Sequence, residues 1–342
     1  MLPDTQVEFV DRGFGKNFVR LLHVKREGTW NRIKEIEVST KLTLSSVKDF
    51  LHGDNSDIIA TDSQKNTVYI LAKKHGVSCI EEFGMILAAH FLKQYSHVTK
   101  ADIYIEEKPW NRIQMDGMEH AHAFIENGDA IRFCHVLQNR NDPPTIKAGL
   151  RDMKIMKTTR SAFANFISDE YRSLPDMNDR IFCTMVYADW DYSDFSGLDF
   201  DGAWTKVKET ILEVFAGPPS SGIFSPSVQK TLYDTQKLAM ARIPQFSYEI
   251  KETLEKKKTH QKLIWLLVTL MMMIDVLRPL LCINGTSKAE DNKTVRWPSP
   301  FDYDLQTQRT LIRSKQHAAF GCQGSISRRE APSEMTVRLM RR

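Results

Sequence analysis

The stretch GDNSDIIATDSQKNT at residues 53–67 decides how the first part of the chain folds. It begins with polar, turn-forming residues, continues through a short apolar segment and ends in a pattern typical of a helix start. Thr61 and Gln64 have the spacing of a capping box, in which each side chain bonds the backbone N–H group of the other residue. Apolar residues follow at helical spacing, namely Val68, Leu71 and Ala72. We therefore predict a helix over about residues 62–74, capped by Thr61.

This helix start also has a functional interpretation. The unpaired N–H groups and the dipole of a helix give its N-terminus a partial positive charge, which suits an anionic ligand. Thr61 adds a hydroxyl and Asp62 a carboxylate at the same point, so these residues are candidates for holding a planar anion and moving a proton. A plain helix cap is the alternative, and the same residues can serve both roles.

Length and composition are typical of a globular protein. The 342 residues are enough for one large or two modest domains. The net charge of +4, with basic residues spread along the chain, does not indicate a nucleic-acid-binding protein. The five cysteines are far apart and form no CxxC pair, so we expect neither a zinc ribbon nor a disulfide framework. His120 and His122 share one face of a predicted strand, but no third ligand is spaced near them, so no metal site is predicted.

The chain has two repeats of one element order. Strands are predicted at residues 18–24, 33–44, 101–106, 120–125 and 130–136, with two helices between the second and third of them; the second helix begins with a capping box at Ser78 and Glu81. After a linker at residues 139–144, strands are predicted at 145–159 and 180–191.

Two further helices follow these strands in the second half. Their apolar faces consist of Trp204, Val207, Ile211 and Phe215 in one helix and Val228, Leu232, Thr235 and Ala239 in the other. The second of these helices opens with serine as cap and Pro226 in its first turn. A repeat of about 140 residues is therefore indicated, and its symmetry predicts more strands after Pro244.

The segment after Pro244 does not supply those strands clearly. Residues 246–250 fit a short strand, and the apolar run at 263–274 is shorter than the roughly 20 residues that span a bilayer, so a membrane anchor is the less favoured alternative. From residue 284 onward the sequence is typical of disorder. We predict a first unit at 1–140, a second unit at 141–250 whose last strand pair is missing or divergent, and a divergent, largely disordered tail at 251–342.

Several blocks of the chain resemble urate oxidase (uricase). They are Phe14-Gly-Lys16, residues 54–67, Asp179-Arg180 and residues 227–233, with Trp204 and Phe215 on the preceding helix. The resemblance covers about residues 7–244. It implies an α+β tunnelling fold (T-fold) with tandem ββααββ units, whose antiparallel sheets form a barrel when subunits assemble into a homotetramer.

The resemblance also implies site residues. The family's proton-handling pair falls on Lys16 and Thr61, and its ligand-holding positions fall on Thr61, Asp62, Phe163, Arg180, Val228 and Gln229. A threonine hydroxyl is too weak an acid to act alone, so it needs an adjacent lysine as a base whose pKa is lowered by burial or nearby positive charge. The arginine would offer a planar fork to urate, the glutamine would pair with the opposite edge, and the phenylalanine would stack on the purine. Each of these three residues could instead be an ordinary core or surface residue. Their joint occurrence at the family's spacing favours a ligand-binding role over that alternative.

The implied reaction needs no metal or organic cofactor. Urate loses a proton, the resulting dianion reduces O2, and water adds to give 5-hydroxyisourate with release of hydrogen peroxide. The protein would supply orientation, proton transfer and charge stabilisation. In the family the sites lie between subunits, so a monomer is expected to be inactive.

After Pro244 the chain departs from the family pattern. Relatives carry a Leu-Pro-Asn-x-His-Tyr-Phe motif with a catalytic histidine, whereas His260 of this chain lacks that context. Relatives commonly end in Ser-Lys-Leu, a peroxisomal address, and this chain ends Leu339-Met-Arg-Arg342, so a peroxisomal location is expected by resemblance with a cytosolic one as alternative. Two functions therefore stay open: a urate-oxidising enzyme, or an impaired T-fold protein that binds a purine or assembles with intact subunits.

Overall fold

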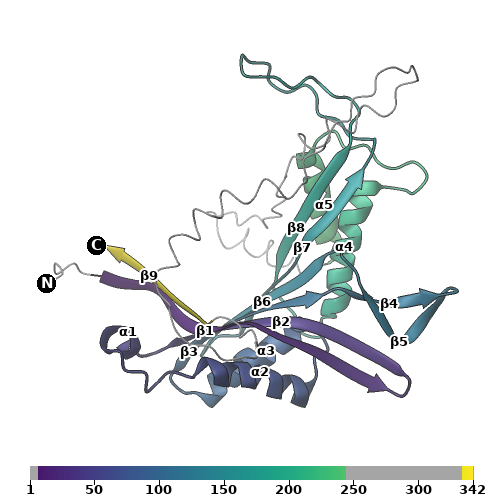
Figure 1. Ribbon diagram of the computed structural model, residues 1–342. Helices are drawn as coiled ribbons and strands as arrows, with labels where there is room; N and C mark the ends of the chain where they lie inside the picture. Colours follow the sequence, from purple (N-terminus) through teal and green to yellow (C-terminus); the bar gives the residue numbers. More distant parts are fainter. Residues whose placement is uncertain (1–6, 244–332, 342) are drawn as a thin grey trace, which may run out of the picture. The chain divides into compact units, whose positions relative to one another are not determined.

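Antiparallel strands, joined edge to edge in the order β8-β7-β6-β3-β2-β1-β9, form the main sheet of the described chain (Figure 1). The structure is a computed structural model that describes residues 7–243 and 333–341. These residues belong to one unit, Met1–Met272 with Ala331–Arg342, and the second unit, Met273–Glu330, lies outside the described residues. The strands of the main sheet are β1 (Val7–Glu27), β2 (Trp30–Leu44), β3 (Val98–Lys108), β6 (Ile131–Asn139), β7 (Thr145–Lys157), β8 (Phe182–Tyr192) and β9 (Ser333–Arg341).

Helices pack on the apolar face of this sheet. The helices are α1 (Lys48–His52), α2 (Thr61–His75), α3 (Ile80–Gln94), α4 (Phe200–Ala216) and α5 (Val228–Arg242). Helix α2 lies against β1, α3 against β3 and β6, and α4 against β7. Alternate residues of the strands are buried, as in β2, where Ile36, Val38 and Leu42 are in the core. One strand face therefore forms the core with the helices, as the alternation in the sequence predicts.

The two repeats share this one sheet. The first repeat supplies β1, β2, α2, α3, β3 and β6, and the second supplies β7, β8, α4 and α5. We expected a linker at residues 139–144; Asn139 ends β6, residues 140–144 make the short connection to β7, and these two strands pair directly. A separate hairpin of β4 (Trp110–Met115) and β5 (Met118–Glu126) is inserted between β3 and β6, and the sequence pattern predicted only its second strand. The predicted repeat is confirmed as far as α5.

A β-bulge interrupts β1 directly after Lys16. Lys16 pairs with Thr40 and Val19 with Val38, so two β1 residues lie opposite one β2 residue. In a regular strand, side chains three residues apart point to opposite faces. Because the bulge lies between them, Lys16 and Val19 are both buried on the same side. The preceding residue has to be glycine, because a Cβ atom on Gly15 would lie 1.6 Å from the carbonyl oxygen of Thr40.

The capping box predicted at the start of α2 is wrong. The helix begins at Thr61 itself, its N-cap residue is Ala60, and no side chain caps it. Gln64 does not bond back to Thr61, because its side chain is buried and donates to the carbonyl oxygen of Ile59. Partners in the core have taken the place of the local cap.

The cap of α3 differs from its prediction in the same way. The N-cap residue is Cys79, whose sulfur accepts from the Glu82 N–H group, and the Ser78 hydroxyl pairs with Glu82 rather than Glu81. Glu81 is instead buried beside Arg132. Glu81 forms a buried ion pair with Arg132 and is therefore not available for the predicted capping box.

A serine caps α5, but two residues later than predicted. The predicted cap is Ser225, directly before Pro226, whereas in the structure the Ser227 hydroxyl oxygen accepts from the Lys230 N–H group at 3.1 Å. Pro226 precedes this cap and is not in the first turn, because the helix starts only at Val228.

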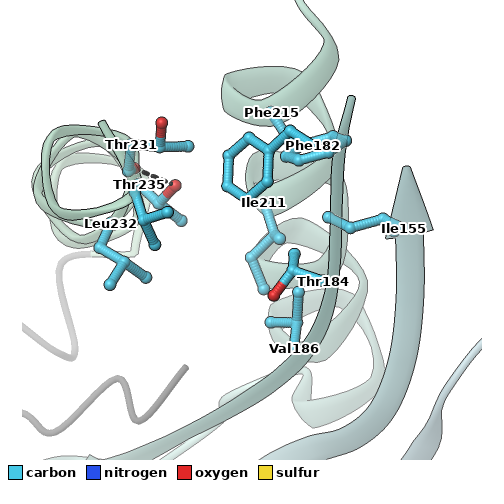
Figure 2. Close-up of a pocket in the computed structure, with 10 residues that line it drawn as sticks. Ile155, Phe182, Thr184, Val186, Ile211, Phe215, Thr231, Leu232 and Thr235 are labelled. Atoms are coloured by element: carbon cyan, nitrogen blue, oxygen red, sulfur yellow. Dashed lines mark hydrogen bonds between the residues drawn. The ribbon is translucent and has the colours of Figure 1, made fainter. Parts of the chain in front are cut away.

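Much of α5 is uncovered in the described chain. Helix α3, its counterpart in the first repeat, buries eight of its 15 residues, whereas α5 buries only Thr235. Helix α5 packs beside α4 and leaves an apolar pocket toward β8 (Figure 2). The pocket is lined by Ile155, Phe182, Thr184, Val186, Ile211, Phe215, Val228, Thr231, Leu232 and Thr235. In the first repeat the corresponding helix is covered by the strand pair that follows it, and here the residues that follow α5 lie outside the described residues.

The tail that we predicted as largely disordered contains a strand near its end. Residues Ser333–Arg341 form β9, which pairs antiparallel with β1 from Val7 to Lys16. The edge of β1 would otherwise leave its backbone N–H and C=O groups without a strand partner, and β9 pairs with them. The predicted strand at 246–250 and the apolar run at 263–274 lie outside the described residues. No helix among the described residues is long and apolar enough to cross a membrane.

Candidate active site

Lys16, Thr61 and Asp62 form a first group of predicted site residues, which we call the first half-site. Lys16 is 8% exposed and lies at the end of the regular part of β1, before the bulge. Thr61 and Asp62 form the first turn of α2, which packs on β1. The pKa of Asp62 is lowered chiefly by its hydrogen bond to Lys65, and the charge of Lys16 contributes to this lowering. Lys16 and the start of α2 are therefore electrostatic neighbours, as the predicted pair requires.

Phe163 and Arg180 belong to a second group, in the long connection between β7 and β8. The guanidinium carbon of Arg180 lies 5.0 Å from the ring centroid of Phe163, so the structure brings these two predicted residues together. Burial lowers the pKa of Arg180. Its Nε atom is buried and has no hydrogen-bond partner within the described part of the chain. A buried donor of this kind is costly unless a ligand or water accepts from it.

Hydrogen bonds hold Arg180 and Phe163 in place. Ser161 and Arg180 are joined twice, since the Arg180 N–H group donates to the Ser161 carbonyl at 2.9 Å and the Ser161 hydroxyl donates to the Arg180 carbonyl at 2.7 Å. Phe163 and Met177 exchange two backbone hydrogen bonds of 2.7 and 2.8 Å. The ends of the connection are thus tied together around the two site residues.

Asp179 adds a further tie beside Arg180. Its carboxylate accepts from the Thr159 hydroxyl at 2.6 Å and from the Arg160 N–H group at 2.9 Å. The Thr159 hydrogen bond is the main reason that the pKa of Asp179 is lowered. Sequence reasoning included Asp179 only as a neighbour of Arg180 and gave it no role.

Val228 and Gln229 reach the same region through the segment that leads into α5. Ser225 pairs with this connection, because its N–H group donates to the Arg160 carbonyl at 2.8 Å and its carbonyl accepts from Ala162 at 3.0 Å. Val228 and Gln229 follow three and four residues later, in the first turn of α5, and Gln229 is exposed. We call Phe163, Arg180, Val228 and Gln229 the second half-site.

The two half-sites lie far apart along the strand order of the sheet. The first adjoins β1 and the second adjoins β8, with β2, β3, β6 and β7 between them (Figure 1). Five strand spacings correspond to about 24 Å across the sheet. One small planar ligand cannot contact both half-sites of a single chain.

Two histidines considered as metal ligands interact with each other. The rings of His120 and His122 lie 4.6 Å apart, and Nδ1 of His120 accepts from the His122 and Ala123 N–H groups. Within residues 7–243 and 333–341, no group of three His, Cys, Asp or Glu side chains is placed to hold a metal ion.

Thr40 and Gln64 lie close to the first half-site, and sequence reasoning missed their contact. The Thr40 hydroxyl donates to the side-chain oxygen of Gln64 at 2.8 Å. Thr40 falls on the apolar face of its strand, in phase with Val38 and Leu42, and a polar residue at such a position is the one signal that would have indicated it.

The described residues form an α+β protein with tandem repeats on one antiparallel sheet. A helix start and a lysine lie beside β1, and an arginine and an aromatic ring lie beside β8. The protein-family model described as Uricase matches residues 13–137 and 146–263. The chain therefore belongs to the uricase family, and its fold is the T-fold.

Relatives and solved structures agree with this assignment. The chain is 48% identical over 239 residues to a uricase of Oryctolagus cuniculus, which covers 70% of this chain and 80% of the relative. It is 49% identical over 239 residues to a uricase of Danio rerio, with the same coverage. The crystal structure of uricase from Arthrobacter globiformis matches with a TM-score of 0.62 and 29% identity, and the match covers 72% of this chain and 79% of that one.

Proposed function

We propose that this chain is a urate oxidase that acts in purine catabolism. Its resemblance to the family suggests that it works in the peroxisome. It would convert urate, O2 and water to 5-hydroxyisourate and hydrogen peroxide. Urate loses two electrons in this reaction and O2 gains them, so no further oxidant is needed. The observation that carries the proposal is the buried Nε of Arg180 beside the Phe163 ring, which no other described residue pairs with, in a chain of the uricase family.

The second half-site would bind the substrate. A planar anion stacked on Phe163 presents its edge to the guanidinium of Arg180, which can donate two parallel hydrogen bonds to a carbonyl oxygen and a ring nitrogen. Gln229 is exposed at the start of α5, where its amide is available to the opposite edge of the ring. A urate anion would thus satisfy the arginine donor that the described residues leave unpaired.

The first half-site would handle protons. Lys16 would accept the proton of the Thr61 hydroxyl, and the resulting oxygen base would take a proton from bound urate. The start of α2 offers backbone N–H groups and a positive dipole end that stabilise negative charge at this point. The pKa of Asp62 is lowered chiefly by its hydrogen bond to Lys65, which keeps its carboxylate ionised when Lys16 is in the neutral form that a base requires.

We further propose that the complete site forms between two copies of the chain. The half-sites of one chain are separated by about five strand spacings, so Lys16 and Thr61 of one copy would face Phe163 and Arg180 of another. The homotetramer expected from the family resemblance supplies such pairs.

Purified protein is expected to remove urate, followed by its ultraviolet absorbance, with release of an equal amount of hydrogen peroxide. The second candidate function is purine binding without turnover, and the observation that favours it is the missing Leu-Pro-Asn-x-His-Tyr-Phe motif. Calorimetric titration with urate under anaerobic conditions separates the two candidates. Binding with no peroxide in air would establish the second, and neither binding nor turnover would contradict both.

A further inference from the structure

Thr40 of β2 and Gln64 of α2 are a polar pair inside an apolar layer. Thr40 is 1% exposed and Gln64 is 0% exposed. The residues next to them on the same face are apolar and buried. They are Val38 and Leu42 on β2, and Val68 and Leu71 on α2. Since apolar side chains at both positions would suit such a layer better, the polar pair calls for an explanation.

The pair joins the backbone of Lys16 to the turn that precedes Thr61. The Lys16 N–H group and the Thr40 hydroxyl oxygen are 3.4 Å apart, and the Thr40 hydroxyl donates to Gln64 Oε1 at 2.8 Å. Gln64 Nε2 in turn donates to the Ile59 carbonyl oxygen at 3.0 Å. These contacts form a continuous chain from β1 through β2 and α2 to the residues just before the helix.

Each end of this chain holds a member of the first half-site. At one end the contact falls on the backbone of Lys16, at the residue where β1 leaves its regular register. At the other end the contact fixes Ile59, two residues before Thr61, and thereby the entry into α2. Loss of either side chain would leave a buried donor or acceptor unpaired and would free the two segments from each other.

We propose that Thr40 and Gln64 are positioning residues that hold Lys16 and Thr61 at the separation needed for proton transfer. This inference rests on the proposed function, because it assigns a role within that site. Neither residue has to touch the substrate, since both act through the backbone of the residues they hold.

The test replaces the hydroxyl and the amide without changing side-chain size. Thr40→Val and Gln64→Met are each expected to lower kcat for urate by about 10- to 100-fold, the effect of a displacement of about 1 Å between reacting groups. KM should change by less than about threefold, because Phe163, Arg180 and Gln229, which would hold the purine ring, belong to the other half-site. The half-maximal point of the pH–kcat profile should move, and Thr40→Ser, which keeps the hydroxyl, should restore most of the activity.

Thr210→Val is the matched control. Thr210 of α4 is also fully buried, donates to the Lys206 carbonyl at 2.7 Å, accepts from Arg242 at 3.1 Å, and belongs to neither half-site. It should lose stability to a similar extent while kcat and the pH profile stay unchanged. If Thr40→Val behaves like Thr210→Val in every one of these measurements, the positioning role is wrong.

A second readout does not depend on turnover. The rate at which acetic anhydride acetylates Lys16 in the intact protein, followed by mass spectrometry with exposed Lys73 as reference, should rise at least about threefold in Thr40→Val and not in Thr210→Val. If the wild-type chain does not oxidise urate, a higher acetylation rate of Lys16 in Thr40→Val would refute the proposed function and support the positioning role. If the wild-type chain does not oxidise urate and the rate in Thr40→Val is unchanged, both are refuted.

Discussion

Replacement of Arg180 by lysine is expected to lower kcat/KM for urate by about 100-fold, which corresponds to about 2.7 kcal/mol. Lysine keeps the positive charge but loses the planar pair of donors that fits a carbonyl oxygen and a ring nitrogen. It also loses the flat guanidinium that lies 5.0 Å from the Phe163 ring. Steady-state kinetics with urate measures the loss.

Arg160→Lys provides the matched control for this prediction. Arg160 lies in the same connection, its side chain is exposed, and its contact with Asp179 is made by the backbone N–H group. The control should keep kcat/KM within about twofold of the wild-type value. Equal losses in Arg180→Lys and Arg160→Lys would show that general disturbance of the connection, and not ligand binding by Arg180, causes the effect.

Replacement of Arg132 by methionine is expected to reduce the free energy of unfolding by about 3 to 5 kcal/mol. Arg132 is buried in β6, and its guanidinium is 2.7 Å from Glu81 in α3 and also pairs with Asp201 in α4. It therefore ties the helix layer of the first repeat to that of the second. Its removal leaves Glu81, which is fully buried, without its cation. Urea unfolding followed by circular dichroism measures the change.

The pH dependence of this loss has a definite sign. Burial raises the pKa of Glu81 above the ordinary value of 4.5 even beside Arg132, and removal of the cation raises it further. The folded variant then holds a proton that the unfolded chain releases, so its stability falls as pH rises through 4.5 and above. The destabilisation should accordingly be larger at pH 8 than near pH 4.5.

Two further variants check the cause of this effect. The double variant Arg132→Met, Glu81→Met removes both charges and should lose less stability than Arg132→Met alone. Arg20→Met breaks an exposed ion pair with Glu37. It should leave the free energy of unfolding nearly unchanged, because water screens a pair whose arginine side chain is 69% exposed. A double variant as unstable as the single one would contradict the role assigned to the buried pair.

The parts of the fold that depend on periodicity could be predicted from the sequence. Alternation in β2 and helical spacing in α4 reflect burial of one face, and burial dominates the free energy of folding. The caps of α2 and α3 could not be predicted in the same way. Gln64 bonds to Thr40, 24 residues away, and such a contact leaves no local pattern at Thr61.

The candidate site was predictable only as a set of residues. The blocks around Lys16, Thr61 and Arg180 match the family pattern, but their spacing in sequence does not reveal how they lie in space. The sheet order separates Lys16 from Arg180 by four strands, and that order depends on pairing between distant segments. Val228 joins Arg180 through the pairing of Ser225 with Ser161, which is equally non-local.

Co-expression of two inactive variants tests most directly whether the half-sites of different copies form one urate-oxidising site. One chain carries Lys16→Met and the other Arg180→Lys, with different affinity tags so that mixed assemblies can be isolated. Urate turnover is expected to return to about one quarter of the wild-type rate, because random assembly completes about one site in four from unaltered residues. Activity no greater than the sum of the two separate variants, while the wild-type chain is active, would contradict it.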